Sequence, residues 1–88
     1  MTIYEIAKQA VEQKTAQSLR HREGNQYDCK ADMFQGHSRK WALMDIFTAS
    51  AIVSIYEALK PENQAKYLSL PLGRLIDLTW KLIKRGGD

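Results

Sequence analysis

The imidazole and thiol groups of this chain all fall within one stretch. His21, Cys29 and His37 are evenly spaced, and zinc accepts nitrogen and sulfur donors of these types. Structural zinc sites usually contain ligand pairs about two to four residues apart, and no such pair occurs here. We therefore interpret these side chains as a free cysteine and two solvated histidines, and we expect no metal ion and no cofactor.

The same stretch contains residue types that other kinds of catalysis use. A Cys–His pair can act as a nucleophile, but it also needs an oxyanion hole and an orienting group, and neither is visible in the sequence. Asp28 and Asp32 would share one face of a short helix, as paired carboxylates for acid–base chemistry require, although a solvated face explains them more simply. A zinc-dependent or thiol enzyme would depend on His21, Cys29 and His37 alone. We expect the protein not to be an enzyme.

Signals for nucleotide and nucleic-acid binding differ in strength. The five glycines lack both the spacing of a phosphate-binding loop and a preceding strand, which excludes the known nucleotide-binding motifs. The net charge of +3 is concentrated in the C-terminal third and favours contact with phosphates, although solvated basic faces explain it more simply. The cations of this nucleic-acid alternative are Arg39, Lys40, Lys81, Lys84 and Arg85, with Trp41 beside the first two.

The 88-residue chain predicts one domain, residues 1–88. Its 44% hydrophobic and 26% charged residues are typical of a globular protein and exclude a mainly disordered or low-complexity chain. The single cysteine, Cys29, cannot form an internal disulfide, which indicates a reducing cytoplasm. Charged residues interrupt every apolar run of the first twenty positions, so we expect no signal peptide and a cytoplasmic location.

Helical periodicity accounts for most of the chain. Thr2 and Glu5 have the spacing of a capping box, and an apolar stripe from Ile3 to Val11 follows. The periodicity stops from about residue 20 to residue 37, where we expect an irregular loop that can include a short helix over residues 28–34. Ser38 is expected to cap the second main helix, which runs through Trp41–Leu59.

That second helix is apolar on nearly all sides, which favours a central place in a bundle. A membrane span is not expected, because the polar and charged residues within it, such as Asp45 and Glu57, would be costly in a bilayer. Pro61 begins a short helix that includes Leu68, and a last helix runs from Leu72 to about Lys84. No segment shows strand alternation. The sequence therefore predicts an all-α bundle of three main helices and one short helix, with a long loop between the first two main helices.

One segment, from Phe47 to Lys84, resembles the C-terminal half of short helical proteins of unassigned function that phages and prophages of Gram-positive bacteria carry. Its sequence is FTASAIVSIYEALKPENQAKYLSLPLGRLIDLTWKLIK, which is somewhat under half of the chain and contains no catalytic motif. The resemblance implies a small phage accessory protein that acts in the cytoplasm of a bacterial host by binding a host or phage protein. The segment 20–37 lies outside the resemblance.

The last helix has an apolar arc wider than a small bundle can cover. Isolated domains rarely leave such a patch bare, so we expect a homodimer or a bound protein partner, and we interpret the protein as a non-enzymatic protein–protein interaction module. A small basic nucleic-acid-binding protein is the alternative. The expected partner-binding residues, including two from the loop that can fold over the same flank, are Leu75, Leu78, Trp80, Leu82, Met33 and Phe34.

A first prediction concerns the core. Ile52 lies on the strongest apolar face of the most apolar helix, and a buried unpaired carboxylate costs more free energy than a domain of this size can lose. Ile52→Asp is therefore expected to unfold the protein. Circular dichroism spectra and melting curves check this, and an unchanged melting temperature would show that Ile52 is exposed.

Overall fold

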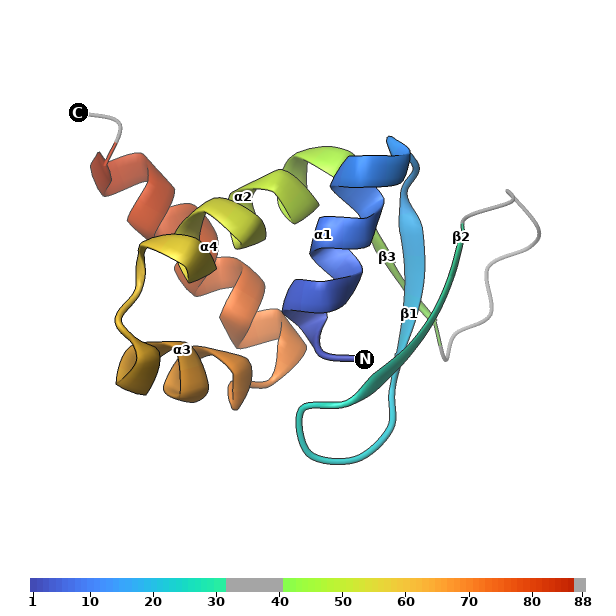
Figure 1. Cartoon of the computed structure of the whole chain (residues 1–88), viewed down its shortest axis with the longest axis horizontal. Helices are drawn as coiled ribbons and strands as arrows, with labels where there is room; N and C mark the ends of the chain where they lie inside the picture. The colour runs from blue at the N-terminus through green and yellow to red at the C-terminus, as the bar shows by residue number, and fades with distance from the viewer. Residues whose placement is uncertain (32–40, 87–88) are drawn as a thin grey trace.

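The computed structural model of the chain describes residues 1–31 and 41–86 and combines helices with a small sheet (Figure 1). The elements in these residues are, in chain order, α1 (Ile3–Gln13), β1 (Gln17–His21), β2 (Tyr27–Ala31), β3 (Ala42–Met44), α2 (Ile46–Ala58), α3 (Pro61–Leu68) and α4 (Leu72–Gly86). The fold is mixed α/β, because three of these elements pair as strands, and the prediction of an all-α helical bundle is wrong.

The first helix begins and ends through local backbone chemistry. The Thr2 side chain accepts a hydrogen bond from the Glu5 amide, and the Glu5 carboxylate accepts one from the Thr2 amide, which confirms the predicted capping box. The helix stops at Lys14, whose φ of 53° places it in the left-handed region. This conformation turns the chain sharply toward β1.

The segment predicted as an irregular loop contains β2 and the end of β1. β1 and β2 form an antiparallel hairpin in which Leu19 lies opposite Cys29, and the turn between them uses Gly24 with a φ of 60°. No short helix forms over the described part of residues 28–34, because residues 27–31 pair with β1 instead. β3 pairs with the other side of β1, which gives the strand order β2-β1-β3.

The second main helix begins later than predicted. Ala42–Met44 form β3, with Met44 opposite Gln17, so this end of the apolar run is a strand. Asp45 is the N-cap of α2, since its side chain accepts a hydrogen bond from the Thr48 amide at 2.7 Å. Ser38, the predicted cap, lies outside the described residues.

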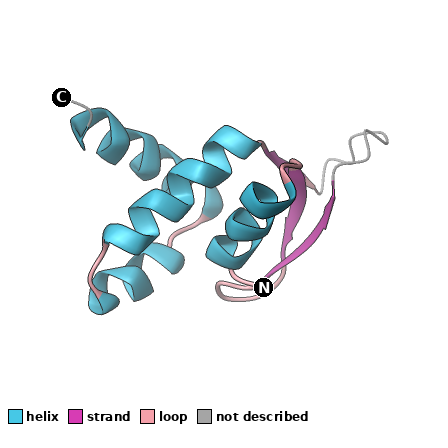
Figure 2. Cartoon of the chain, turned by 45° about the horizontal axis from the view of Figure 1, so that its top comes forward, coloured by secondary structure: helices cyan, strands magenta, loops and turns pink. Residues whose placement is uncertain are grey.

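The elements stack in layers around α1 (Figures 1 and 2). The sheet covers one side of α1, α2 packs against another side, and α4 packs against α2. Ile3, Ile6, Ala7 and Ala10 of α1 are fully buried, as the predicted stripe requires. The other members of the buried core are Leu19, Tyr27, Met44, Ala49, Ile52, Tyr67 and Leu75.

The two C-terminal helices are joined by a buried polar contact. The Thr79 hydroxyl donates to the Leu75 carbonyl at 2.6 Å and shares a second hydrogen bond with the Tyr67 hydroxyl. Since the Thr79 proton goes to the carbonyl, Tyr67 is the donor in the second bond. The predicted start of α3 at Pro61 and of α4 at Leu72 is confirmed.

An aromatic and polar contact joins α1 to α2. The rings of Tyr4 and Tyr56 stack with their centroids 4.0 Å apart, and the Tyr4 hydroxyl donates to the Glu57 carboxylate at 2.6 Å. This hydrogen bond, followed by desolvation, raises the pKa of Tyr4 to about 12. The contact is therefore complete only while Tyr4 keeps its proton.

The second prediction follows from that pKa. The pKa of Tyr4 is higher in the folded than in the unfolded chain, so its stabilising contribution is full below about pH 10 and is lost as the pH rises through about 12. Tyr4→Phe keeps the stacked ring but removes the hydrogen bond. Its melting temperature is expected to lie below that of the wild type at about pH 8 and to approach it by about pH 12.

Burial also raises the pKa of Tyr27 and of Tyr67, so every variant loses stability at high pH. The difference in melting temperature between the wild type and Tyr4→Phe at each pH isolates the contribution of Tyr4. Tyr56→Phe is the matched control, because it also keeps a ring in the stack and leaves the Glu57 contact intact. A difference in melting temperature between the wild type and Tyr4→Phe that stays constant from pH 8 to about 12 would contradict the raised pKa of Tyr4.

Candidate functional site

The sheet has a polar face that points away from α1, which we call the outer face. Side chains alternate along a strand, and the inward positions, among them Leu19, Tyr27 and Met44, are buried against the core. The intervening positions carry Arg20 and Asp28, which lie directly opposite each other in the register. The outer face therefore carries opposite charges side by side on β1 and β2.

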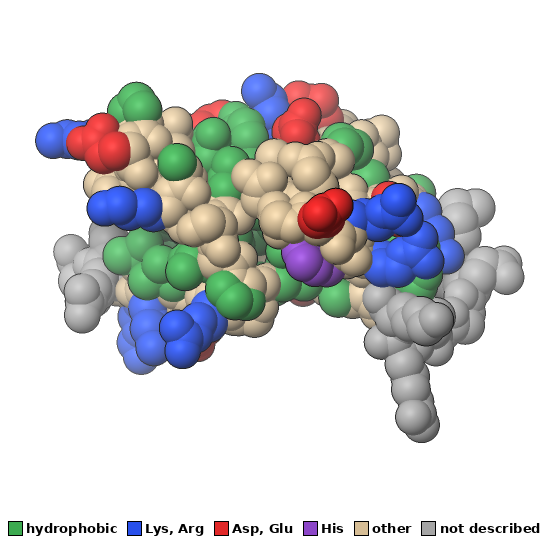
Figure 3. Space-filling view, turned by 90° about the horizontal axis from the view of Figure 1, so that it is seen from below, with side chains coloured by type: hydrophobic (Ala, Val, Ile, Leu, Met, Phe, Trp, Pro, Cys, Tyr) green, Lys and Arg blue, Asp and Glu red, His purple; other side chains and the backbone are tan. Residues whose placement is uncertain are grey.

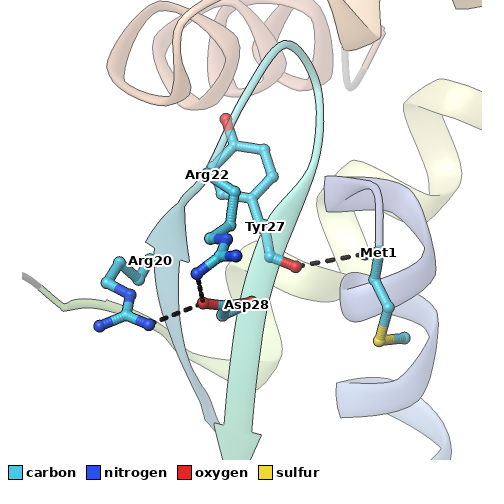
Figure 4. A network of polar contacts seen from close by, with 5 residues as sticks. All are labelled: Met1, Arg20, Arg22, Tyr27 and Asp28. Carbon is cyan, nitrogen blue, oxygen red and sulfur yellow. Dashed lines mark hydrogen bonds and ion pairs between the residues drawn. The ribbon is translucent and has the colours of Figure 1, made fainter.

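Two arginines converge on one carboxylate of this face. The Asp28 Oδ2 lies 2.8 Å from Arg20 Nη2 and 3.4 Å from Arg22 Nη1 (Figure 4). The hydrogen bond from Arg20 and the charge of Arg22 hold the pKa of Asp28 below its usual range. Asp28 thus stays ionised at neutral pH and fixes both guanidinium groups beside each other.

Trp41 joins this group from the residue just before β3. The Lys30 ammonium lies over its ring at 4.3 Å from the centroid, and the Arg20 guanidinium lies over the same ring at 4.9 Å. Cations over an indole face are attracted by the electron-rich ring. We call Arg20, Arg22, Lys30 and Trp41 the basic face.

The basic face carries a net positive charge. Its three cations are offset by Asp28 alone on the strands, while Glu23 lies in the exposed hairpin turn. The side chain of Arg22 is 61% exposed and that of Arg20 is 40% exposed. Figure 3 shows that Lys and Arg side chains gather over this end of the molecule and, separately, over the helices at the other end.

The junction of β3 and α2 carries exposed apolar side chains, which we call the 43–47 patch. Phe47 is 80% exposed, Leu43 is 52% exposed and Ile46 is 36% exposed. Leu43 lies on the outer face of the sheet, opposite Ser18, whereas Ile46 and Phe47 begin α2. Phe47 was not among the predicted partner-binding residues, because an apolar residue in an apolar helix was expected to be buried.

The predicted partner-binding residues of α4 do not form one surface. Leu75 is fully buried in the core and is not available to a partner. Leu78 and Trp80 are both partly exposed, but residues two apart point to opposite flanks of a helix. Leu82 is half-buried. Met33 and Phe34 lie outside the described residues.

Of the cations predicted for nucleic-acid binding, the structure describes the side chains of Lys81 and Lys84, which lie three residues apart on α4. Lys81 forms an exposed ion pair with Asp77 at 3.1 Å, and Lys84 is exposed near the end of α4. Arg39, Lys40 and the side chain of Arg85 lie outside the described residues. Arg20, Arg22 and Lys30 were missed, because Leu19 is the one apolar residue of β1 and the alternation of apolar and polar residues there is weak.

The candidate zinc or thiol residues are engaged in local contacts where they are described. His21 Nε2 contacts the Gly24 carbonyl at 2.8 Å, and the Cys29 thiol donates to the Met1 sulfur at 3.6 Å. His37 and Asp32 lie outside the described residues. Within residues 1–31 and 41–86, no group of three or more metal-binding side chains comes together.

One cleft of about 400 Å³ lies between the hairpin turn and the link from α3 to α4. Its walls are His21, Gly24, Tyr27 and residues 69–72. The His21 ring meets the Tyr27 ring edge-on at 5.2 Å while its Nε2 contacts Gly24. The Nε2 atom of His21 is therefore engaged by the wall of the cleft itself.

The described residues thus offer two exposed surfaces, the basic face and the 43–47 patch, which meet at β3. No protein-family model, curated protein sequence or solved structure matches this chain. None of the helices in the described segments is both long and apolar enough to cross a membrane.

Proposed function

We propose that this protein is a non-enzymatic interaction module that binds a protein partner through the 43–47 patch. The observation that carries the proposal is Phe47, a large aromatic side chain that is 80% exposed in the first turn of α2. Phenylalanine is enriched at protein interfaces, where an aromatic side chain fills an apolar pocket of the partner. Burial of such a side chain contributes about 1.5–3 kcal/mol.

The patch is held in place by the elements on both of its sides. The Asp45 carboxylate caps α2 through the Thr48 amide, and Met44 is buried opposite Gln17 in the sheet. Phe47 therefore projects from a fixed backbone rather than from a free loop. A preorganised contact loses less conformational entropy when it binds, which favours affinity.

The proposed partner is a protein of a phage or of its bacterial host, including a second copy of this chain. The resemblance of residues 47–84 to small phage and prophage proteins supports this setting and a cytoplasmic location. A homodimer would bury the same patch on both copies around a two-fold axis. Leu78 and Trp80, on the two flanks of α4, are the alternative contact surfaces.

The third prediction separates these surfaces. Phe47→Ser is expected to leave the melting temperature nearly unchanged, because the side chain is mostly exposed, and to weaken association about tenfold or more, because the apolar contact is lost. Sedimentation equilibrium at micromolar concentration measures the self-association. Affinity purification from the bacterial host with mass spectrometry identifies any other partner, and the variant should fail to retain it.

Leu78→Glu is the matched control on α4, since Leu78 is also an exposed apolar residue. It should leave association at the wild-type level. Association that is lost in Leu78→Glu but retained in Phe47→Ser would move the interface to α4. A wild type that is monomeric and retains no specific protein would refute the proposal.

A further inference from the structure

We propose that the basic face of the sheet binds single-stranded nucleic acid, with phosphates on Arg20, Arg22 and Lys30 and an unstacked base on Trp41. This site goes beyond the proposed protein interface, because it lies on different residues and recognises a different chemistry. It also differs from the cations that the sequence indicated, since Lys81 and Lys84 lie on α4 at the other end of the described chain.

The arrangement of cations on the sheet favours a polyanion. Arg20 and Arg22 are two residues apart, so both side chains project from the same face of the hairpin, and Lys30 projects from the neighbouring strand. Asp28 orients the two guanidinium groups through one contact to each. A guanidinium has five N–H donors, so most of its donors remain for phosphate oxygens.

The indole ring distinguishes nucleic acid from other anions. The Arg20 guanidinium and the Lys30 ammonium lie over the Trp41 ring, so a base that takes the place of one of them on the ring has its phosphates within reach of both cations. Stacking on aromatic side chains combined with backbone charge contacts is the usual basis of single-strand binding. An acidic peptide would use the cations but has no flat group that needs the ring.

The position of Trp41 favours a single-stranded over a double-stranded nucleic acid. A side chain on a sheet surface can stack only on a base that is already unpaired and splayed out, because the bases of a duplex are stacked on one another. If three cations each contact a phosphate of a single strand, the logarithm of the association constant K should fall with the logarithm of the salt concentration with a slope of about −2. Binding should therefore weaken about twentyfold between about 50 and 200 mM NaCl.

The fourth prediction uses the full chain carrying Trp80→Phe. The chain contains two tryptophans, so this change makes the fluorescence report Trp41 alone. Titration with an oligothymidine of about twenty nucleotides is expected to quench Trp41 and to give the salt slope of about −2. No quenching and no binding at about 50 mM NaCl would refute the site.

Variants locate the site by the anisotropy of a labelled oligonucleotide. Arg22→Gln with Lys30→Gln should reduce the salt slope to about −0.7, because one cation remains. Trp41→Phe should retain binding, whereas Trp41→Leu should weaken it about tenfold or more, because stacking needs an aromatic ring. Lys81→Gln with Lys84→Gln removes the same charge from α4 and should change the affinity little.

Competing ligands test the assigned chemistry. Heparin and poly-glutamate carry charge without bases, and a duplex of equal length has its bases paired. Each should compete more weakly than the oligothymidine for binding to the protein. Equal competition by heparin would reduce the site to a general anion surface, and equal competition by poly-glutamate would assign it to acidic proteins. Equal duplex binding, or a larger loss in the α4 control than in the sheet variants, would also overturn the proposal.

Phe47→Ser separates this site from the protein interface. It should leave the oligonucleotide affinity unchanged, since Phe47 belongs to α2 and not to the basic face. Loss of protein association with intact oligonucleotide binding would support both sites. Parallel loss of both activities in Phe47→Ser would contradict a separate nucleic-acid site.

Discussion

The fold depends on how one three-turn helix fills the space between a sheet and another helix. Around the axis of α1, the side chains run in order from Gln9, which contacts Gln17 and Cys29 of the sheet, to Tyr4, which contacts Tyr56 and Glu57 of α2. The four fully buried residues, Ile3, Ile6, Ala7 and Ala10, lie between these two edges. Two of the four are alanines, whose small side chains allow neighbouring elements to approach closely. The strands β1 and β2 and the helix α2 thus contact α1 directly, and α4 packs against α2. β3 is held by its pairing with β1, and α3 is joined to α4 through Tyr67 and Thr79.

This arrangement decides which residues are left for function. The helices cover the inner face of the sheet alone, so the alternating residues of β1 and β2 expose Arg20 and Lys30 on the opposite side. α2 starts directly after β3, and its first turn extends beyond the sheet with Phe47 exposed. The basic face and the 43–47 patch are thus separated by only a few residues along the backbone. A polyanion and a protein partner would approach neighbouring parts of the same end of the molecule.

The sequence was sufficient for the helices that begin with strong local signals and insufficient for the sheet. Thr2 with Glu5, and Pro61 at the start of α3, act through backbone groups only a few residues away, so their effect is visible in a short window. β1 is only five residues long and places Gln17 at a buried position, which weakens the alternation of apolar and polar residues. Gly24-Asn25 was a hairpin signal that could have been used. The basic face was beyond local prediction, because Arg20, Lys30 and Trp41 meet only through the register of separate strands.

The strand order β2-β1-β3 also has a consequence for aggregation. Edge strands can recruit strands of other molecules through their outward backbone groups, and proteins discourage this with short edges, charges or a covering segment. β3 is limited to three residues, and β2 carries Asp28 and Lys30. At Tyr27, the outward N–H and carbonyl of β2 are already bonded to the backbone of Met1 (Figure 4). Met1 thus blocks the start of that edge, so intermolecular strand addition is disfavoured there.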